Sequence, residues 1–228
     1  MIDLESKFLH VYNNNLFGGI ESVSGPGSGL EQTKIISVEI PTLIKNYGIR
    51  SVIDAPCGDL YWMAPMISSG VFEFYTGVDI VKDMIEKNRH KFSSERINFE
   101  QKNIVTDILS LNDLILCRDC FVHLSFDDII RSIINFKKSG SKYLLTTTFL
   151  KHWNADPDGK DFWRPINLES TPFNFPPPLE IINEGCTEGD GGYTDKSLAL
   201  WDLNNIMITE SGQEFDFLRF FQTIYARK

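Results

Sequence analysis

The chain has 228 residues, a formal net charge of −9, and 42% hydrophobic and 23% charged residues. These proportions are typical of a folded globular domain and exclude a disordered chain, and no apolar run is long enough to cross a bilayer. An acidic chain without a Lys/Arg cluster lacks the basic face that nucleic acid or an anionic membrane requires, so we expect neither partner. The N-terminal residues lack the features of a secretory signal, which makes a cytoplasmic location the default expectation.

Residues 1–48 are predicted to form a helical cap. Their apolar residues have helical spacing up to Val11 and again over residues 30–47, where Pro41 should kink or divide the helix. The glycine-rich stretch between the two helices indicates a loop. Because glycines allow close backbone approach, the loop at residues 22–28 is either a lid over a ligand or a flexible linker.

Residues 49–149 alternate between strand and helix patterns, which predicts an α/β domain with a doubly wound, mostly parallel sheet and helices on both faces. The run at residues 114–117 is continuously apolar, as expected for a strand covered on both faces. In the following helix, Ser125 and Asp128 can form a capping box, and Gly140 marks the stop. The predicted strands cover residues 51–54, 72–80, 97–100, 114–117 and 143–148.

Residues 150–212 are rich in Pro, Gly, Asn and aromatic residues and are predicted to be an irregular insertion on the substrate side. So long an irregular connection is uncommon in a compact domain and is usually functional. The aromatic, β-rich residues 217–226 predict a last strand within residues 213–228. We therefore expect the whole chain to be a single domain.

Cys117 and Cys120 form a C-x-x-C pair, which raises the question of a metal or redox site. A structural zinc site needs two more ligands at similar spacing, and no second such pair exists. Cys117 also ends an apolar run that is typical of a buried strand. We therefore interpret the thiols as buried and predict no metal site, with a metal or redox role as the alternative.

Two motifs follow neighbouring strands of the predicted sheet. Asp54-Ala-Pro-Cys-Gly-Asp59 comes at the end of the first strand, and Gly77-Val-Asp79-Ile80 closes the second. In doubly wound sheets, ligands bind beyond the carboxyl ends of the strands. Asp79 is therefore predicted to accept hydrogen bonds from the ribose of an adenosine cofactor, or else to cap the following helix.

Together with Leu116-Cys-Arg-Asp-Cys-Phe-Val-His-Leu124, these motifs resemble those of class I S-adenosylmethionine-dependent methyltransferases over residues 51–149. Pro56 and the Asp59-Leu60 pair depart from the glycines of the common pattern. The resemblance implies a seven-stranded sheet and S-adenosyl-L-methionine as cofactor. The implied contacts are the methionine end for Asp54, Cys57, Gly58 and Asp59, the ribose for Asp79, the adenine for Ile80, Asn103 and Ile104, and the amino group for the main chain of Arg118. The loop lacks the G-x-G-x-x-G form, which weighs against a dinucleotide.

Catalysis of methyl transfer requires mainly in-line positioning, with a base where the acceptor is a hydroxyl. His123, after the fourth strand, is the candidate base, and the alternative is that it caps the next helix or is simply buried. Asp119 could orient its ring or contact the substrate. The two could also hold a divalent metal, but two ligands do not make a site.

The acceptor pocket is predicted in the segment after the fifth strand. Aromatic walls with a few polar anchors suit a sugar or a similar small ligand. The candidates are Trp153, Trp163, Arg164, Asn167, Tyr193, Asp195, Lys196 and Trp201. Arg164 and Lys196 could bind a phosphate or carboxylate group. The alternative is a surface loop held in place by its own aromatic residues.

These patterns predict methyl transfer to an oxygen, in preference to nitrogen, of a small polar metabolite. By analogy with bacterial enzymes that modify surface polysaccharides, the hypothesis extends to a sugar, nucleotide-sugar or other phosphorylated acceptor. An NAD(P)-dependent oxidoreductase on a related fold and a catalytically silent cofactor-binding module are the alternatives.

Overall fold

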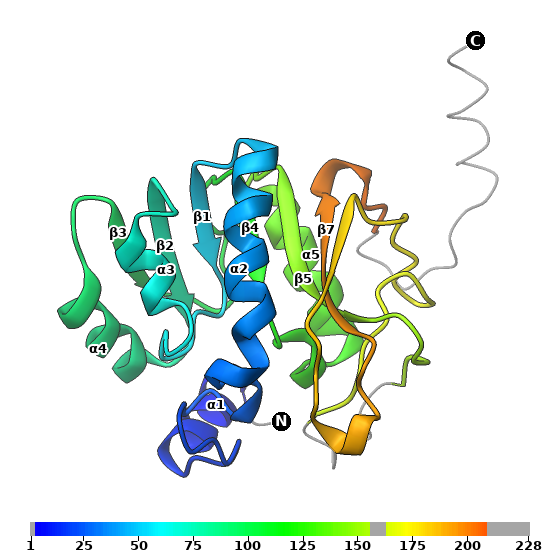
Figure 1. Cartoon of the computed structure of the whole chain (residues 1–228), viewed down its shortest axis with the longest axis horizontal. Helices are drawn as coiled ribbons and strands as arrows, with labels where there is room; N and C mark the ends of the chain where they lie inside the picture. Colours follow the sequence, from blue (N-terminus) through cyan, green and yellow to red (C-terminus); the bar gives the residue numbers. More distant parts are fainter. Residues whose placement is uncertain (1–2, 156–162, 209–228) are drawn as a thin grey trace.

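Seven short strands form a central sheet in the computed structural model, which describes residues 3–155 and 163–208 (Figure 1). The strands are β1 Ser51–Asp54, β2 Phe74–Asp79, β3 Ile97–Gln101, β4 Leu114–Cys117, β5 Tyr143–Phe149, β6 Glu180–Asn183 and β7 Lys196–Asp202. Their order in the sheet is β3-β2-β1-β4-β5-β7-β6. The pairs from β3 to β5 are parallel, whereas β7 runs antiparallel to both β5 and β6. The predicted mostly parallel, seven-stranded sheet is therefore confirmed for the described residues.

Five α-helices accompany the sheet in the described part of the chain: α1 Leu4–Asn13, α2 Leu30–Tyr47, α3 Ala64–Ser69, α4 Lys82–Phe92 and α5 Phe126–Lys138. Short 3₁₀ turns are η1 Pro26–Ser28, η2 Phe121–His123, η3 Gly189–Gly191 and η4 Leu203–Asn205. None of the helices over these described ranges is both long and apolar enough to span a bilayer.

The helix α2 runs unbroken through Pro41, so the prediction that this proline could divide the helix is wrong. Proline removes one backbone donor and crowds the preceding turn. Here Ile36, Ile40 and Leu43 are fully buried on the same helix, on both sides of the proline. Burial of this apolar stripe stabilises the helix enough to offset the lost hydrogen bond.

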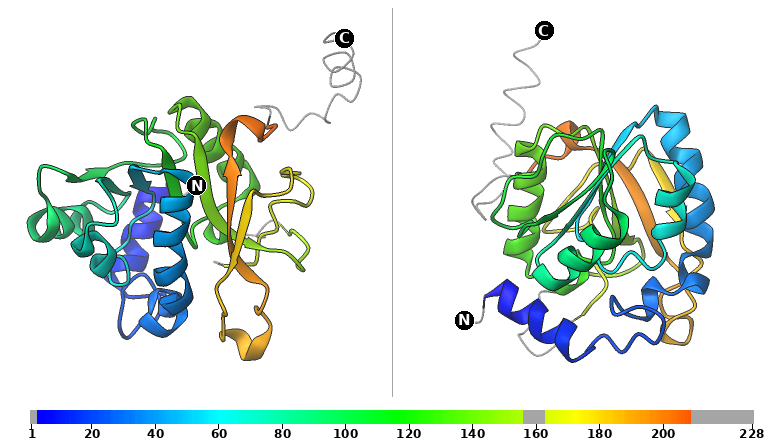
Figure 2. Two further views of the ribbon diagram at one scale, coloured as in Figure 1. Left: turned by 45° about the horizontal axis from the view of Figure 1, so that its top comes forward. Right: turned by 90° about the vertical axis from the view of Figure 1, so that its left-hand side faces the viewer.

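The central strands are apolar on both faces because helices cover both. Leu114 and Leu116 of β4 pack in the core that includes α2 and α3, whereas Ile115 and Cys117 pack in the core that includes α5. Figure 2 shows α2 and α5 on opposite sides of the sheet. Alternation of side chains along a strand thus builds two cores from one apolar run.

The helix α5 begins as its sequence predicts. The Ser125 hydroxyl oxygen accepts a hydrogen bond from the Asp128 backbone N–H at 3.2 Å, and the hydroxyl donates to the Asp128 carboxylate at 2.8 Å. Gly140 follows the helix with a positive φ of 78°, which glycine adopts without strain. The predicted capping by Ser125 and Asp128 and the predicted end of the helix before Gly140 are both confirmed.

The predicted irregular insertion at residues 150–212 contains regular structure, which is a correction. Its residues 180–183 and 196–202 form β6 and β7, and β7 lies between β5 and β6. The chain returns to the sheet because β5 leaves an edge whose backbone groups need partners, and the apolar run of β7 provides them. The last strand predicted at residues 217–226 lies outside the described residues.

Gly77 in β2 provides a test of how tightly this strand packs against Phe99 and Cys57. A Cβ atom at this position would lie 2.6 Å from the Phe99 ring and 3.1 Å from Cys57 Sγ. We expect Gly77→Ala to lower the free energy of unfolding by about 1–3 kcal/mol, the usual cost of overpacking. Chemical denaturation measures this loss. The matched variant Gly77→Ala/Phe99→Leu should lose less than the sum of the two single changes, and strict additivity would contradict the clash.

Candidate active site

A cavity opens at the carboxyl ends of β1, β2 and β4, where neighbouring parallel strands end at one edge of the sheet. The loops after β1, β3 and β4, the end of β2, α1 and the loop at residues 22–28 line it. All nine predicted cofactor residues line the cavity: Asp54, Cys57, Gly58, Asp59, Asp79, Ile80, Asn103, Ile104 and Arg118. The two predicted catalytic residues, Asp119 and His123, also line it.

The Asp79 carboxylate joins the loop after β1 to the loop after β2 in the cavity wall. Its Oδ2 accepts a hydrogen bond from the Gly58 backbone N–H at 3.1 Å, and its Oδ1 accepts one from the Val81 N–H at 2.9 Å. Val81 is the N-cap residue of α4, and that helix has no side-chain cap hydrogen bond, so Asp79 fixes the turn before the helix and does not cap it. Each carboxylate oxygen retains capacity for a further donor. Burial raises the pKa of Asp79 to about 6, although these backbone donors oppose the shift.

Asp54, the last residue of β1, is fully enclosed beside Asp79. The Tyr75 hydroxyl donates to Asp54 Oδ2 at 2.6 Å. Burial raises the pKa of Asp54 to about 7, opposed by the Tyr75 hydrogen bond and reinforced by the negative charge of Asp79. The two neighbouring carboxyls therefore share one low-dielectric wall.

Gly58 allows a close approach that a larger residue would prevent. Its φ is 57°, and a Cβ atom would lie 2.3 Å from Ser24 Oγ. Asn88 of α4 donates to the Gly58 carbonyl at 2.8 Å, which fixes the loop from the other side. Burial raises the pKa of the adjacent Cys57 thiol well above its usual value, so this thiol stays neutral.

Asp59 holds the loop at residues 22–28 against the loop after β1. The Ser22 hydroxyl lies 2.8 and 2.9 Å from the two Asp59 carboxylate oxygens, and the Val23 N–H donates to Oδ2 at 3.0 Å. The resemblance implied a contact with the methionine end for Asp59. In the structure its carboxylate fastens a loop whose Val23, Ser24 and Ser28 line the same cavity.

The apolar side of the cavity combines predicted and unpredicted residues. Asn103 Oδ1 accepts the Val105 N–H at 2.9 Å, so this side chain shapes the turn that carries Ile104. Further apolar lining that we did not predict comes from Leu4, Phe8, Val11, Tyr12, Phe17, Val23, Trp62, Val81, Met84, Val105 and Leu124. Leu4, Phe8 and Val11 belong to the predicted N-terminal helical cap, and Val23 belongs to the loop predicted as a possible lid, although the individual side chains were not predicted.

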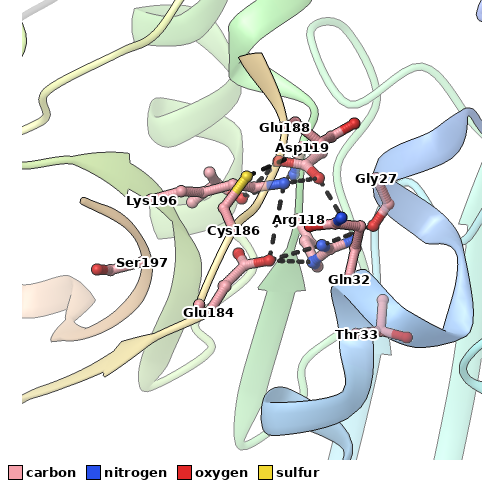
Figure 3. Close-up of polar contacts among 12 residues, drawn as sticks. Gly27, Gln32, Thr33, Arg118, Asp119, Glu184, Cys186, Glu188, Lys196 and Ser197 are labelled. Atoms are coloured by element: carbon pink, nitrogen blue, oxygen red, sulfur yellow. Dashed lines mark hydrogen bonds and ion pairs between the residues drawn. The ribbon is translucent and has the colours of Figure 1, made fainter. Parts of the chain in front are cut away.

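Arg118 and Asp119, directly after β4, join a group of buried charges (Figure 3). Arg118 donates to Glu184 at 2.6 Å and to the Gly27 carbonyl at 2.9 Å. Lys196 Nζ donates to Asp119 Oδ2 at 2.6 Å. Burial alone would raise the pKa of Asp119, but Lys196 and Arg118 lower it to about 2, so this carboxylate is ionised. The Lys196 ammonium, predicted to bind an acidic group of the acceptor, is engaged by Asp119 instead.

His123 ends the η2 turn and faces two aromatic rings. Its ring centroid lies 4.7 Å from that of Phe17 and 6.5 Å from that of Phe8. Its carbonyl accepts a hydrogen bond from Lys7 Nζ at 3.4 Å. N-terminal residues therefore pack against the predicted base.

The eight predicted acceptor residues are not among those that line the cavity. Asn167 and Trp201 have structural roles: the Asn167 amide donates to the Leu150 carbonyl at 3.1 Å, and the Trp201 indole N–H donates to the Pro176 carbonyl at 2.8 Å. Trp153 is 90% exposed.

The remaining predicted acceptor residues also make contacts within the fold. The rings of Trp163 and Tyr193 pack at 4.8 Å, and Arg164 donates to the Phe121 carbonyl at 3.0 Å. Asp195 accepts the Lys151 N–H at 2.7 Å and lies 3.1 Å from the His152 ring nitrogen. Trp163 and Tyr193 thus pack within the segment, whereas Arg164 contacts the η2 turn outside it.

The four cysteines are free and buried, including the pair Cys117 and Cys120. Residues 3–155 and 163–208 contain no group of three or more His, Cys, Asp or Glu side chains that could hold a metal ion.

No family model matches the chain, and no curated protein matches it. Several solved structures match at low sequence identity. The 1,6-didemethyltoxoflavin-N1-methyltransferase of Burkholderia thailandensis is 14% identical with a TM-score of 0.59, over 86% of this chain and 85% of that chain. A SAM-dependent methyltransferase from Anabaena variabilis is 14% identical with a TM-score of 0.56, over 88% of this chain and 95% of that chain.

Human N-acetylserotonin methyltransferase is also 14% identical with a TM-score of 0.56, over 88% of this chain and 60% of that chain. This chain therefore has the class I fold of S-adenosylmethionine-dependent methyltransferases.

The buried Asp54 carboxyl predicts a pH-dependent stability. Its pKa of about 7 in the folded protein lies above the value of about 4 in an unfolded chain, so the folded state gains a proton as the pH falls through 7. As the pH rises from 5 to 8, this group should lower the free energy of unfolding of the ligand-free protein by about 2–3 kcal/mol. We expect Asp54→Asn, which keeps an acceptor for Tyr75, to remove most of that loss.

Chemical denaturation at pH 5 and pH 8 measures the effect. Asp79, with a pKa of about 6, also makes the free energy of unfolding fall as the pH rises. The Asp54→Asn variant keeps this contribution. Asp127→Asn, at a side chain that is 67% exposed, is the control and should keep the wild-type slope. If the free energy of unfolding of Asp54→Asn fell with pH as steeply as that of the wild type, the pH dependence would not come from Asp54.

Proposed function

We propose that this chain is an S-adenosylmethionine-dependent methyltransferase. The observation that carries the proposal is that one cavity collects the nine predicted cofactor residues at the ends of adjacent strands. The class I fold supports it, because ligands of such sheets bind at this edge. We assign the ribose to Asp79 and the adenine to the apolar side around Ile80 and Ile104.

The charge of the cavity supports this cofactor over a dinucleotide. Four carboxylates line it, those of Asp54, Asp59, Asp79 and Asp119. The basic lining residues are Lys102, Arg118 and His123. S-adenosylmethionine carries a positive sulfonium, which an acidic wall attracts, whereas the pyrophosphate of NAD(P) would be repelled.

The N-terminal residues form the cover of this site in our proposal. The cavity is lined by Leu4 and Phe8 of α1 and by Val23 and Ser24 of the following loop. Since α1 lies across one end of the sheet (Figure 1), the helix would act as the cap and the loop as the lid that excludes water.

His123 is our proposed base. Bound S-adenosylmethionine supplies an activated methyl group. His123 would accept the proton of an acceptor hydroxyl as its oxygen forms a bond to the methyl carbon and the carbon–sulfur bond breaks. Phe17 and Phe8, against the His123 ring, would hold it in place and keep water away.

The acceptor in this proposal is a small polar molecule, methylated on oxygen in preference to nitrogen. Two structural neighbours are named after small-molecule substrates, 1,6-didemethyltoxoflavin and N-acetylserotonin. A sugar or nucleotide-sugar acceptor and a cytoplasmic location stay hypotheses from the sequence. A catalytically silent module would bind the cofactor and turn over no acceptor.

Substitution of Asp79 tests the cofactor assignment. We expect Asp79→Ala to weaken binding of S-adenosylhomocysteine by about 10- to 100-fold, since a carboxylate that accepts hydroxyl hydrogen bonds is lost. Isothermal titration calorimetry measures the affinity, with Asp83→Ala on the exposed start of α4 as the control. Unchanged affinity in Asp79→Ala would refute the ribose role, and binding of NAD in place of S-adenosylhomocysteine would favour the oxidoreductase.

Substitution of His123 tests the base. We expect His123→Ala to keep its affinity for S-adenosylhomocysteine but to lose turnover by about two to four orders of magnitude. Release of S-adenosylhomocysteine with a panel of hydroxyl-bearing acceptors measures turnover. His10→Ala, on the exposed side of α1, is the control. Near-normal turnover in His123→Ala would remove this residue from the mechanism.

A further inference from the structure

A histidine and a buried aspartate form a hydrogen-bonded pair outside the residues that line the cavity. His152 Nδ1 lies 3.1 Å from Asp195 Oδ2, and the same oxygen accepts the Lys151 backbone N–H at 2.7 Å. The Asp195 side chain is 5% exposed and the His152 side chain is 26% exposed. We call His152 and Asp195 the dyad. The proposed base is His123, so neither member of the dyad has a role in the chemistry so far.

Three aromatic rings, those of Phe149, Trp163 and Tyr193, pack around the imidazole, and we call them the aromatic group. The His152 ring centroid lies 5.6 Å from that of Phe149 and 5.8 Å from that of Tyr193. The Trp163 ring lies 4.8 Å from that of Tyr193 and 5.8 Å from that of Phe149. Phe149 is fully buried, whereas the other two rings and the imidazole are half-buried. Their exposed parts form one surface that is both aromatic and polar.

The dyad stands at the same edge of the sheet as the cavity. β5 ends at Phe149 and β7 begins at Lys196, and these two residues are paired (Figure 1). Asp195 directly precedes Lys196, and the Lys196 ammonium donates to Asp119, after β4, at 2.6 Å. Since β5 lies next to β4 and neighbouring strands are about 4.8 Å apart, we expect the dyad within roughly 10 Å of Asp119.

The aromatic group is also joined to the turn that carries the proposed base. Arg164, the next residue after Trp163, donates its backbone N–H to the Val122 carbonyl at 3.1 Å. Val122 directly precedes His123, which lines the cavity. A molecule that extends from His123 across the end of β5 would therefore meet the aromatic group next.

Neutral groups already hold the segment after β5 in place. The His152 N–H donates to the Phe149 carbonyl at 3.2 Å, and the Asn167 amide donates to the carbonyls of Leu150 and His152 at 3.1 and 3.4 Å. A buried carboxylate loses hydration that an apolar side chain of similar volume would not lose. The presence of Asp195 is therefore better explained by its effect on the imidazole than by the stability of the segment.

Asp195 determines which imidazole nitrogen is available. A carboxylate only accepts hydrogen bonds, so His152 Nδ1 carries the proton that it donates to Asp195. Nε2 is then the acceptor of the neutral ring, and it has no hydrogen-bond partner within the described part of the chain. A ligand hydroxyl suits this nitrogen, because it can donate to the neutral ring or accept from the protonated one.

We propose that His152 binds a second hydroxyl group of the methyl acceptor and that Asp195 is its positioning residue. The inference rests on the proposed function. One hydroxyl of the acceptor would lie at His123 for methylation, its ring would pack on the aromatic group, and its far hydroxyl would bond to His152 Nε2. The Lys196 and Asp195 charges already have partners. The acceptor class is therefore a neutral, flat ring compound with hydroxyl groups at opposite ends.

Matched acceptors separate the second hydroxyl from the rest of the molecule. The pairs, in order of length, are hydroquinone with phenol, 2,6-dihydroxynaphthalene with 2-naphthol, and 4,4′-dihydroxybiphenyl with 4-hydroxybiphenyl. With the unmodified chain, we expect kcat/KM for at least one diol to exceed that of its single-hydroxyl counterpart by about tenfold, the usual worth of a hydrogen bond. This is more than the doubling that two equivalent hydroxyl groups give. Release of S-adenosylhomocysteine measures the rates.

Substitution of His152 tests the contact. We expect His152→Ala to lower kcat/KM for that diol about tenfold, to the value of its counterpart, because only the diol loses a hydrogen bond. The rate with the counterpart and the affinity for S-adenosylhomocysteine should change less than about threefold. His152→Gln, which keeps a hydrogen-bonding group, should retain part of the preference, and Asp195→Asn should reduce it. Loss of a merely structural contact would lower the rates with both acceptors alike.

His90→Ala, at an exposed position of α4, is the matched control and should keep the preference for the diol. Thermal unfolding shows that each variant is folded. A preference that survives in His152→Ala, or equal rates within every pair for the unmodified chain, would overturn the role of His152 and leave the methyltransferase proposal intact. Turnover of none of these acceptors by a chain that binds S-adenosylhomocysteine would overturn the acceptor class alone. Failure of the unmodified chain to bind S-adenosylhomocysteine would overturn the proposed function and this inference together.

Discussion

Three carboxylates at the ends of β1, β2 and β4 line one cavity wall, and the groups around them stabilise them there. Each is stabilised differently: Asp54 by the Tyr75 hydroxyl, Asp79 by two backbone N–H groups, and Asp119 by Lys196. The differences set their charges, since the pKa values are raised to about 7 and 6 for the first two and lowered to about 2 for the third. The wall therefore holds a permanent anion at β4 and two groups that gain protons near neutral pH.

The same polar groups also hold the cover of the cavity. The loop at residues 22–28 is fastened to Asp59, after β1, and to Arg118, after β4. These attachment points belong to the two central neighbouring strands of the site. Any opening of this loop must break hydrogen bonds to charged groups, which are stronger than those between neutral groups. Charged residues of the cavity wall therefore also hold the loop that covers the cavity.

Local patterns in the sequence were sufficient for the parallel half of the sheet. The apolar run of β4, the capping pair Ser125 and Asp128, and the acidic residues that end β1 and β2 depend on neighbours a few residues away, so a pattern can show them. The contacts that complete the site instead join residues far apart in the sequence. Arg118 and Glu184 are separated by 66 positions, and Lys196 and Asp119 by 77. Nothing in either segment alone indicates its partner.

The strand β7 explains why several of the predicted acceptor residues lie outside the cavity. Its pairing with β5 puts Lys196 opposite Phe149, with the lysine ammonium on Asp119, while Trp201 enters the core. In a segment predicted to be irregular, Lys196 suggested a phosphate or carboxylate ligand, but it begins β7 and its ammonium is paired with Asp119. On the cofactor-facing side, the cavity then offers an acceptor the rings of Phe8 and Phe17, the His123 imidazole and the Asp119 carboxylate. Under our proposal, this combination favours a neutral, hydroxyl-bearing acceptor with an apolar face over a phosphorylated one, because the nearest buried ammonium already has its counter-ion.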